Sequence, residues 1–192
     1  MGMHKLLTYG ANLVSSARLL LAVIWVIAFF SNHAQGHALG AVAIAGAVSD
    51  FLDGRIARWT RSASQFGRWL DNVADIVFIL VALSCETYAG VIPAYLPALI
   101  AASFVQYAVD SVVIRGSAVP LKSRLGHWAG IFNYGIVIAL AGMPRTLLPG
   151  ALPRVAAPII ALFYLAAMGE RALSYRAAWP AQPRCLRPVA GE

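Results

Sequence analysis

The sequence predicts an all-α membrane protein, a single domain with six transmembrane helices. The first observation is composition: 60% of the 192 residues are hydrophobic and 12% are charged, whereas soluble domains carry about 25% charged residues. The second is length, because about 20 apolar residues per membrane-spanning helix leave room for six spans. The third is that charged residues gather between long apolar stretches. This apolar content excludes a disordered chain and argues against a water-soluble one.

Six apolar stretches follow one another along the chain. They cover residues 13–30, 38–51, 73–89, 94–114, 128–141 and 155–168. The second and third are long enough to span only if their helices continue into the polar segment between them, and we expect that they do. Residues 1–176 then form the transmembrane domain, followed by a polar tail over 177–192. A cleaved signal peptide is the alternative for the first stretch, but Asn12 and Arg18 interrupt it.

The charges of the loops predict the orientation in the membrane. Lys and Arg are concentrated in residues 54–68 and 115–126 and in the C-terminal tail, whereas 31–38 and 86–97 contain none. The positive-inside rule then places both termini and the 54–68 segment on the cytoplasmic side of the cytoplasmic membrane, against the opposing but outnumbered Arg145 and Arg154. The net charge of +7 thus points to the lipid bilayer as partner and not to nucleic acid. Cys85 and Cys185 form neither a metal-ligand spacing nor a disulfide framework.

Half of the eight acidic residues lie between residues 50 and 75. Asp50 and Asp53 are three residues apart, and Asp71 and Asp75 are four apart, so each pair occupies one face of a helix. A turn of about eight residues, over 59–66, would bring the two faces together in antiparallel helices. We therefore expect four carboxylates to converge at the cytoplasmic membrane surface.

Four converging carboxylates repel one another and need positive charge nearby. Their oxygen-only donor set suits hard divalent cations, and four carboxylates can bridge two Mg²⁺ ions, with Mn²⁺ as the alternative metal. No His or Cys is placed to complete a zinc site. The other interpretation is a solvated face paired with the surrounding arginines. Ionisable groups beside membrane spans are costly, which favours the functional interpretation.

The spacing of this acidic segment resembles the signature of a known family. It reads D-x2-D-G-x2-A-R-x8-G-x3-D-x3-D, carried by Asp50, Asp53, Gly54, Ala57, Arg58, Gly67, Asp71 and Asp75. This pattern is similar to that of the CDP-alcohol phosphatidyltransferases, integral membrane enzymes of phospholipid head-group synthesis. The segment 12–18, in which an Asn is followed by serines and an Arg, resembles the first helix of that family. The resemblance implies a six-helix core and a homodimer.

The resemblance also implies a reaction and roles for particular residues. The phosphatidyl group of CDP-diacylglycerol would pass to the hydroxyl of a small alcohol, and CMP would leave. Two divalent metals would be held by Asp50, Asp53, Asp71 and Asp75, and Asp75 would also act as general base. Contacts to the CDP-lipid would come from Ser15, Ser16, Arg18, Gly54, Ala57, Arg58, Ser64 and Gly67.

The acceptor alcohol is less clearly marked in the sequence. Arg115, Lys122 and Arg124 form a basic cluster that suits an acceptor with its own phosphate, such as glycerol 3-phosphate or inositol phosphate. The alternative is that these three residues only obey the positive-inside rule. Asp110 lies deep in the fourth apolar stretch, where it pairs with Arg18 or Arg115 or binds acceptor hydroxyls. His127 stands where many family members have Lys, which speaks against a phosphatidylglycerophosphate synthase.

Two other functions use convergent aspartates in membranes. A Mg²⁺-dependent membrane prenyltransferase also binds a diphosphate, but such proteins usually need more spans and lack the pattern of Gly54, Ala57, Arg58 and Gly67. A divalent-cation transporter would place its acids near the middle of the membrane, whereas these acids adjoin an arginine-rich loop. Both alternatives are weaker than phosphatidyl transfer.

Overall fold

The computed structural model describes residues 3–31, 37–60, 65–115, 124–143 and 151–178. Over these ranges the chain is entirely helical apart from short turns, with six helices and no strands. Their bounds are α1 Met3–Phe30, α2 His37–Thr60, α3 Gln65–Tyr88, α4 Tyr95–Arg115, α5 Arg124–Gly142 and α6 Ala151–Ala178. Each predicted apolar stretch lies on one of these helices, apart from the end residues Ala89 and Ala94. The all-α prediction is therefore confirmed.

The helices that carry the aspartates extend into the polar segment, as expected. α2 continues past Asp50 to Thr60, and α3 begins at Gln65, before Asp71. The predicted eight-residue turn over 59–66 was wrong, because its first two and last two residues are helical. None of these four residues is Gly or Pro, so nothing in the local sequence stops either helix earlier.

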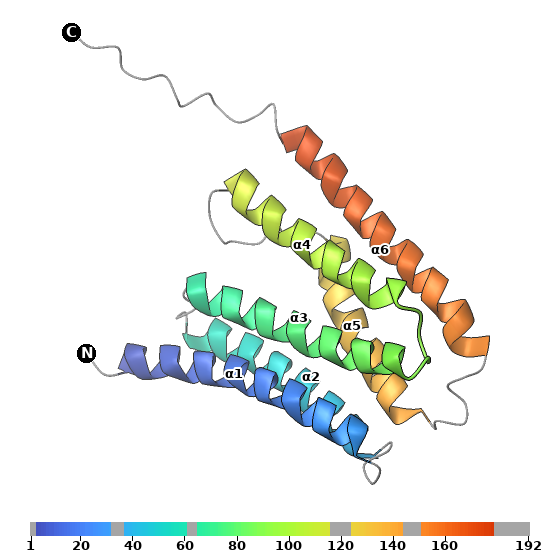
Figure 1. Cartoon of the computed structure of the whole chain (residues 1–192). Coiled ribbons are helices and arrows are strands. Elements are labelled where there is room, and N and C mark those ends of the chain that lie inside the picture. Colours follow the sequence, from blue (N-terminus) through green and yellow to red (C-terminus); the bar gives the residue numbers. More distant parts are fainter. Residues whose placement is uncertain (1–2, 32–36, 61–64, 116–123, 144–150, 179–192) are drawn as a thin grey trace.

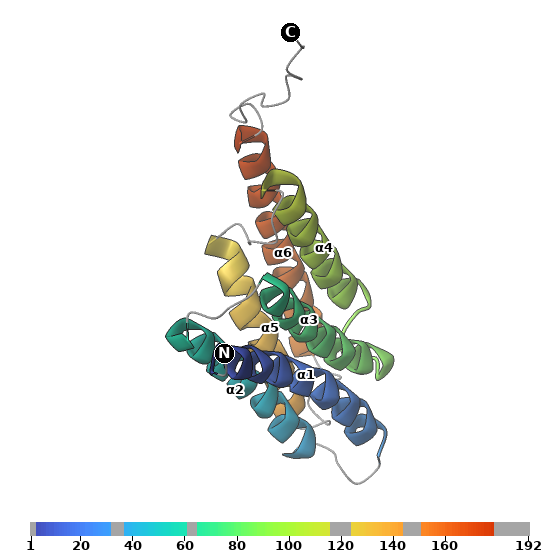
Figure 2. The ribbon, with the colours of Figure 1, turned by 90° about the vertical axis from the view of Figure 1, so that its left-hand side faces the viewer.

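The helices form two outer pairs with two helices between them. Figure 1 shows α1 and α2 on one side and α4 and α6 on the other, with α3 and α5 between them, and Figure 2 shows the same order from another direction. α1 packs against both α2 and α3, α5 lies against α2, and α4 pairs with α6. α1 is therefore the element that holds α2 and α3 to a common core.

An aromatic contact at Phe78 joins four helices. Phe78 of α3 is fully buried, and Trp25 of α1, also fully buried, meets its ring edge-on with centroids 5.9 Å apart. Tyr134 of α5 stacks on the same ring at 6.1 Å. From α2, Gly46 faces Phe78 so closely that a Cβ at this position would lie 2.9 Å from its Cε1 atom. The missing side chain of Gly46 is what lets α2 approach α3 here.

The turn between α3 and α4 is closed by a glycine. Gly90 has a φ of 72°, a left-handed conformation that glycine adopts without a steric penalty. The Val91 N–H donates to the Glu86 carbonyl at 3.0 Å and the Gly90 N–H donates to the Thr87 carbonyl at 2.9 Å. These bonds satisfy carbonyls at the end of α3 and send the chain directly into α4.

One helix of the described part of the chain meets the length and composition of a membrane span. This segment is Val155–Ser174 of α6. Shorter apolar segments lie on three other helices, at Ser16–Phe30, His37–Leu52 and Trp128–Gly142. Arg18 and Asp50 lie within the first and the second of these segments. Six helices are thus established, and six spans remain a prediction.

The close approach at Gly46 predicts opposite effects of two glycine substitutions on the same helix. Gly46→Ala should lower the free energy of unfolding by about 1–2 kcal/mol, because the buried Phe78 ring must move. Gly40→Ala should raise it by up to about 1 kcal/mol, because nothing lies within 4 Å of the added methyl group and Ala is the better helix former. Thermal unfolding of the purified variants measures both, and a Gly46→Ala variant as stable as Gly40→Ala would contradict this packing.

Candidate functional site

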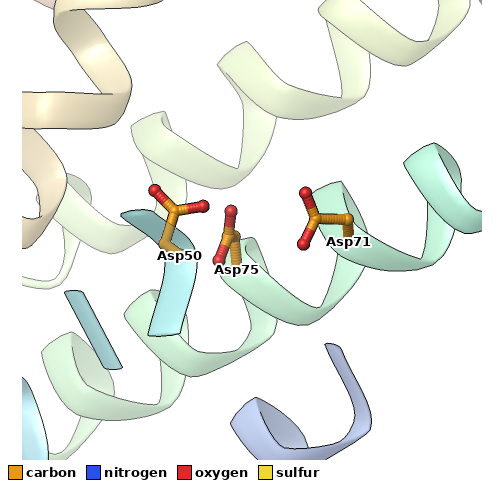
Figure 3. Close-up of side chains that lie close together, drawn as sticks. All are labelled: Asp50, Asp71 and Asp75. Carbon is orange, nitrogen blue, oxygen red and sulfur yellow. The ribbon is translucent and has the colours of Figure 1, made fainter. Parts of the chain in front are cut away.

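Three of the four predicted aspartates meet at one point (Figure 3). Asp50 comes from α2, and Asp71 and Asp75 come from successive turns of α3. One carboxylate oxygen from each lies within 4.8 Å of the other two. Asp53 also lies on α2, but its side chain is outside the described residues. The predicted convergence of the two helices is therefore present for Asp50, Asp71 and Asp75.

The Arg18 guanidinium lies at the centre of this cluster. Arg18, on α1, is fully buried. Its Nη1 atom is 2.8 Å from Oδ1 of Asp71 and 3.7 Å from Oδ1 of Asp50, and it also contacts Oδ1 of Asp75. One nitrogen is thus shared by three carboxylates, and its charge offsets part of their mutual repulsion. Sequence reasoning assigned Arg18 to the CDP-lipid and did not foresee this arrangement.

The three aspartates of the cluster differ in how far their side chains are exposed. The side chains are 42% exposed at Asp50, 33% at Asp71 and 22% at Asp75. A cation or a phosphate can therefore reach the carboxylates from the Asp50 side, while Arg18 closes the cluster from within the bundle. Asp75 is the innermost of the three.

Tyr134 of α5 is a member of the site that sequence reasoning missed. Its hydroxyl donates a hydrogen bond of 2.8 Å to Oδ1 of Asp75, and the residue is only 9% exposed. The available signal was a polar hydroxyl within the fifth apolar stretch. By itself that signal identifies no partner, since only the packing of α5 on α3 brings the two groups together.

The donor set fits a hard divalent cation. The three residues whose ligand atoms converge offer carboxylate oxygens only, which is the chemistry that Mg²⁺ and Mn²⁺ prefer. The partial exposure of Asp50 and Asp71 leaves an approach for the ion.

The other predicted CDP-lipid residues are only partly described. Ser16 is exposed on α1, two residues before Arg18, and Gly67 is partly buried on α3. The remaining predicted contacts either lie on helices without described side chains or fall outside the described residues. They are Ser15 on α1, Gly54, Ala57 and Arg58 on α2, and Ser64.

The predicted acceptor residues lie at the ends of α4 and α5. Arg115 ends α4 and Arg124 begins α5, but their side chains are outside the described residues, as is all of Lys122. Asp110, on α4, is half-buried, and its charge acts on that of Arg171 on α6, which sequence reasoning used only as an orientation charge.

Arg171 links α6 to α4 through several contacts. Its Nη1 atom donates to the Ser103 carbonyl at 3.0 Å, and its guanidinium lies over the Tyr107 ring, 5.2 Å from the centroid. One turn along, Gln106 Nε2 donates to the Met168 carbonyl at 3.1 Å. These contacts hold α6 against α4.

Comparison with known proteins decides the family. The sequence model of the CDP-alcohol phosphatidyltransferases matches residues 8–170, from the first turns of α1 to the last third of α6. This chain belongs to the CDP-alcohol phosphatidyltransferase family. The matched region contains the aspartate cluster, Arg18 and Tyr134.

Its relatives include proteins with two different names. A cardiolipin synthase (CMP-forming) from Streptomyces coelicolor is 34% identical over 129 residues, which are 64% of this chain and 59% of the relative. A CDP-diacylglycerol–glycerol-3-phosphate 3-phosphatidyltransferase from Arabidopsis thaliana is 30% identical over 131 residues, 67% of this chain and 51% of the relative. The chain thus spans only about half the length of these relatives.

The shared nitrogen predicts that Arg18 stabilises this phosphatidyltransferase fold. Arg18→Ala should lower the free energy of unfolding by about 3 kcal/mol in the presence of a chelator, because the three carboxylates lose their buried counter-charge. Arg18→Lys, which retains the charge, should lower the free energy of unfolding by less than Arg18→Ala does. Added Mg²⁺ should restore more stability to Arg18→Ala than to the wild type.

Thermal unfolding with chelator and with Mg²⁺ gives all three comparisons. An Arg18→Ala variant as stable as the wild type in chelator would show that the carboxylates do not depend on Arg18.

Proposed function

We propose that this protein transfers the phosphatidyl group of CDP-diacylglycerol to the hydroxyl of a small alcohol, with release of CMP, in phospholipid biosynthesis. The observation that carries the proposal is the convergence of Asp50, Asp71 and Asp75 within a chain that matches the family over residues 8–170. Relatives whose names state CDP-diacylglycerol as a substrate support the donor.

Asp50, Asp53, Asp71 and Asp75 would hold the two divalent ions that the family signature implies. When bound, such ions neutralise the charge of a diphosphate and stabilise both the attacking and the leaving oxygen. The carboxylate oxygens of the three described aspartates lie close enough together to share an ion. Mg²⁺ is the metal we propose, and Mn²⁺ has the same preference for oxygen ligands.

Asp75 would take the proton of the acceptor hydroxyl. The freed oxygen attacks the phosphorus that bears the diacylglycerol, a new P–O bond forms, and the bond to the CMP oxygen breaks. A positioned carboxylate contributes typically 10²- to 10⁴-fold in such a proton transfer. The family signature supports this assignment, because Asp75 stands at its fourth aspartate.

The CDP-lipid would lie across α1, α2 and α3 near the exposed side of the cluster. Ser16, which is exposed two residues before Arg18, would approach it from α1. Gly54 and Ala57 would leave room for the cytidine, and Arg58 would bind the diphosphate, where a guanidinium can make paired hydrogen bonds. Ser15, Ser64 and Gly67 complete the proposed set. Arg18 would then serve both the aspartates and the lipid.

All six helices would span the cytoplasmic membrane, with both termini and the site on the cytoplasmic side. Large apolar side chains point outward on helices at both sides of the bundle, where they would meet lipid. Examples with more than half of their surface exposed are Leu20, Ile27, Ile159, Leu162 and Leu173. An interfacial site suits a reaction in which acyl chains stay in lipid while the acceptor arrives from water. The homodimer that the family resemblance implies remains a prediction.

For the acceptor we propose a small alcohol that carries its own phosphate, such as glycerol 3-phosphate or inositol phosphate. The basic residues Arg115, Lys122 and Arg124 favour it, as do relatives whose names state glycerol 3-phosphate. Asp110 would bind acceptor hydroxyls from α4. The relative named as a cardiolipin synthase (CMP-forming) makes cardiolipin synthesis the competing reaction.

The role of Asp75 predicts a loss of activity on an isosteric change. With CDP-diacylglycerol, Mg²⁺ and an acceptor panel, Asp75→Asn should release CMP at least about 100-fold more slowly than the wild type. Glu86→Gln is the matched control, because it makes the same carboxylate-to-amide change on the same helix at a residue that is 1% exposed and outside the cluster. If no acceptor releases CMP with the wild type, or if Asp75→Asn equals Glu86→Gln, the proposed reaction is wrong.

The acceptor assignment predicts a change in one Michaelis constant only. Asp110→Asn should raise KM for the acceptor by about tenfold, the effect of losing one hydrogen bond to a charged group, and should leave KM for CDP-diacylglycerol unchanged. Glycerol 3-phosphate, inositol phosphate and phosphatidylglycerol form the panel. An unchanged acceptor KM, or an equal rise for CDP-diacylglycerol, would place Asp110 outside the acceptor site.

A further inference from the structure

Tyr134 is tied to Asp75 by its hydroxyl and to the same helix by its ring. The hydroxyl donates to Oδ1 of Asp75 at 2.8 Å, and the ring stacks on Phe78, with the two planes 24° apart. Phe78 follows Asp75 by three residues, so both contacts fall on one face of α3. The phenol therefore cannot turn away from Asp75 without breaking a buried aromatic contact.

Tyr134 and Arg18 bind the same oxygen of Asp75. The hydroxyl of Tyr134 and Nη1 of Arg18 both contact Oδ1. A carboxylate that is held at one oxygen by two donors has its plane and rotamer defined. Its second oxygen, Oδ2, is then the one available for a metal ion or for the proton of an alcohol.

The chemistry of a phenol suits this task. A tyrosine hydroxyl offers one donor to a carboxylate, so it can hold Oδ1 of Asp75 without adding a charge of its own to the cluster. Tyr134 reaches Asp75 from α5, whereas Arg18 reaches it from α1. The carboxylate is thus held from two sides of the bundle.

We propose that Tyr134 is a positioning residue that orients the Asp75 carboxylate for metal binding and for proton transfer. This inference rests on the proposed function, in which Asp75 is a metal ligand and the general base. Tyr134 touches neither substrate nor metal in this scheme and acts only through Asp75. Its effect should therefore appear in the rate and in metal affinity, and not in the affinity for the lipid.

The test compares two tyrosine-to-phenylalanine changes in the purified full-length protein. Tyr134→Phe keeps the ring on Phe78 and removes only the hydroxyl. Tyr164→Phe is the control, because Tyr164 is also buried but its hydroxyl contacts Asn133 and not an aspartate. Steady-state CMP release should show kcat lowered about 10- to 100-fold in Tyr134→Phe, the range for a hydrogen bond to a charged group, with KM for CDP-diacylglycerol unchanged. The kcat of Tyr164→Phe should stay near that of the wild type.

A second readout does not require turnover. Mn²⁺ titrated into the protein without lipid substrate should bind several-fold more weakly to Tyr134→Phe than to Tyr164→Phe. In an Asp75→Asn background the same Tyr134→Phe change should have no further effect on Mn²⁺ affinity, because interacting residues are not additive.

The outcomes separate this inference from the proposed function. If the wild type releases no CMP but Tyr134→Phe still weakens Mn²⁺ binding in an Asp75-dependent way, the reaction is wrong and the positioning role stands. If the wild type is active and Tyr134→Phe matches Tyr164→Phe in both kcat and Mn²⁺ affinity, the positioning role is wrong. An equal loss in both variants, or additivity with Asp75→Asn, would likewise overturn it.

Discussion

The Arg18 guanidinium lies fully buried between three carboxylates from two other helices, and the first half of the bundle is organised around this contact. Asp50, Asp71 and Asp75 would repel one another strongly at distances below 5 Å if no positive charge lay between them. Arg18 supplies that charge from α1, and α1 is also the helix that packs on both α2 and α3. The same interaction thus brings three helices together and assembles the polar centre.

The apolar packing around Phe78, next to this polar centre, holds the same helices together. Phe78 lies one turn beyond Asp75 and is enclosed by Trp25, Gly46 and Tyr134 from three other helices. Because protein interiors are close-packed, a shift of any of these helices would also displace the aspartate side chains. The site is therefore held by a rigid hydrophobic layer and is not carried on a loop.

The exposure of the cluster and its position in an apolar bundle fit a reaction between a lipid and a water-soluble molecule. The carboxylates become more accessible from Asp75 to Asp50, while large apolar side chains cover the outside of the helices. On α4 and α6, by contrast, the polar contacts of Arg171 face inward between two helices. These polar contacts between described residues thus lie at the interface of α4 and α6.

The local sequence determined the helices and the candidate metal ligands. Each apolar run marked one of the six helices, although four helix ends lie eight to ten residues beyond the runs. The spacing of Asp71 and Asp75 placed them on one helical face, because it depends only on helical periodicity. Only the tertiary structure decided which side chains contact the aspartates. Arg18 reaches them from α1, and Tyr134 reaches Asp75 from α5. Such pairings depend on how helices far apart in the sequence are rotated and packed, and no local period encodes that rotation. For the same reason the sequence offered Arg18 as a partner for Asp110, whereas the fold places Arg18 among Asp50, Asp71 and Asp75.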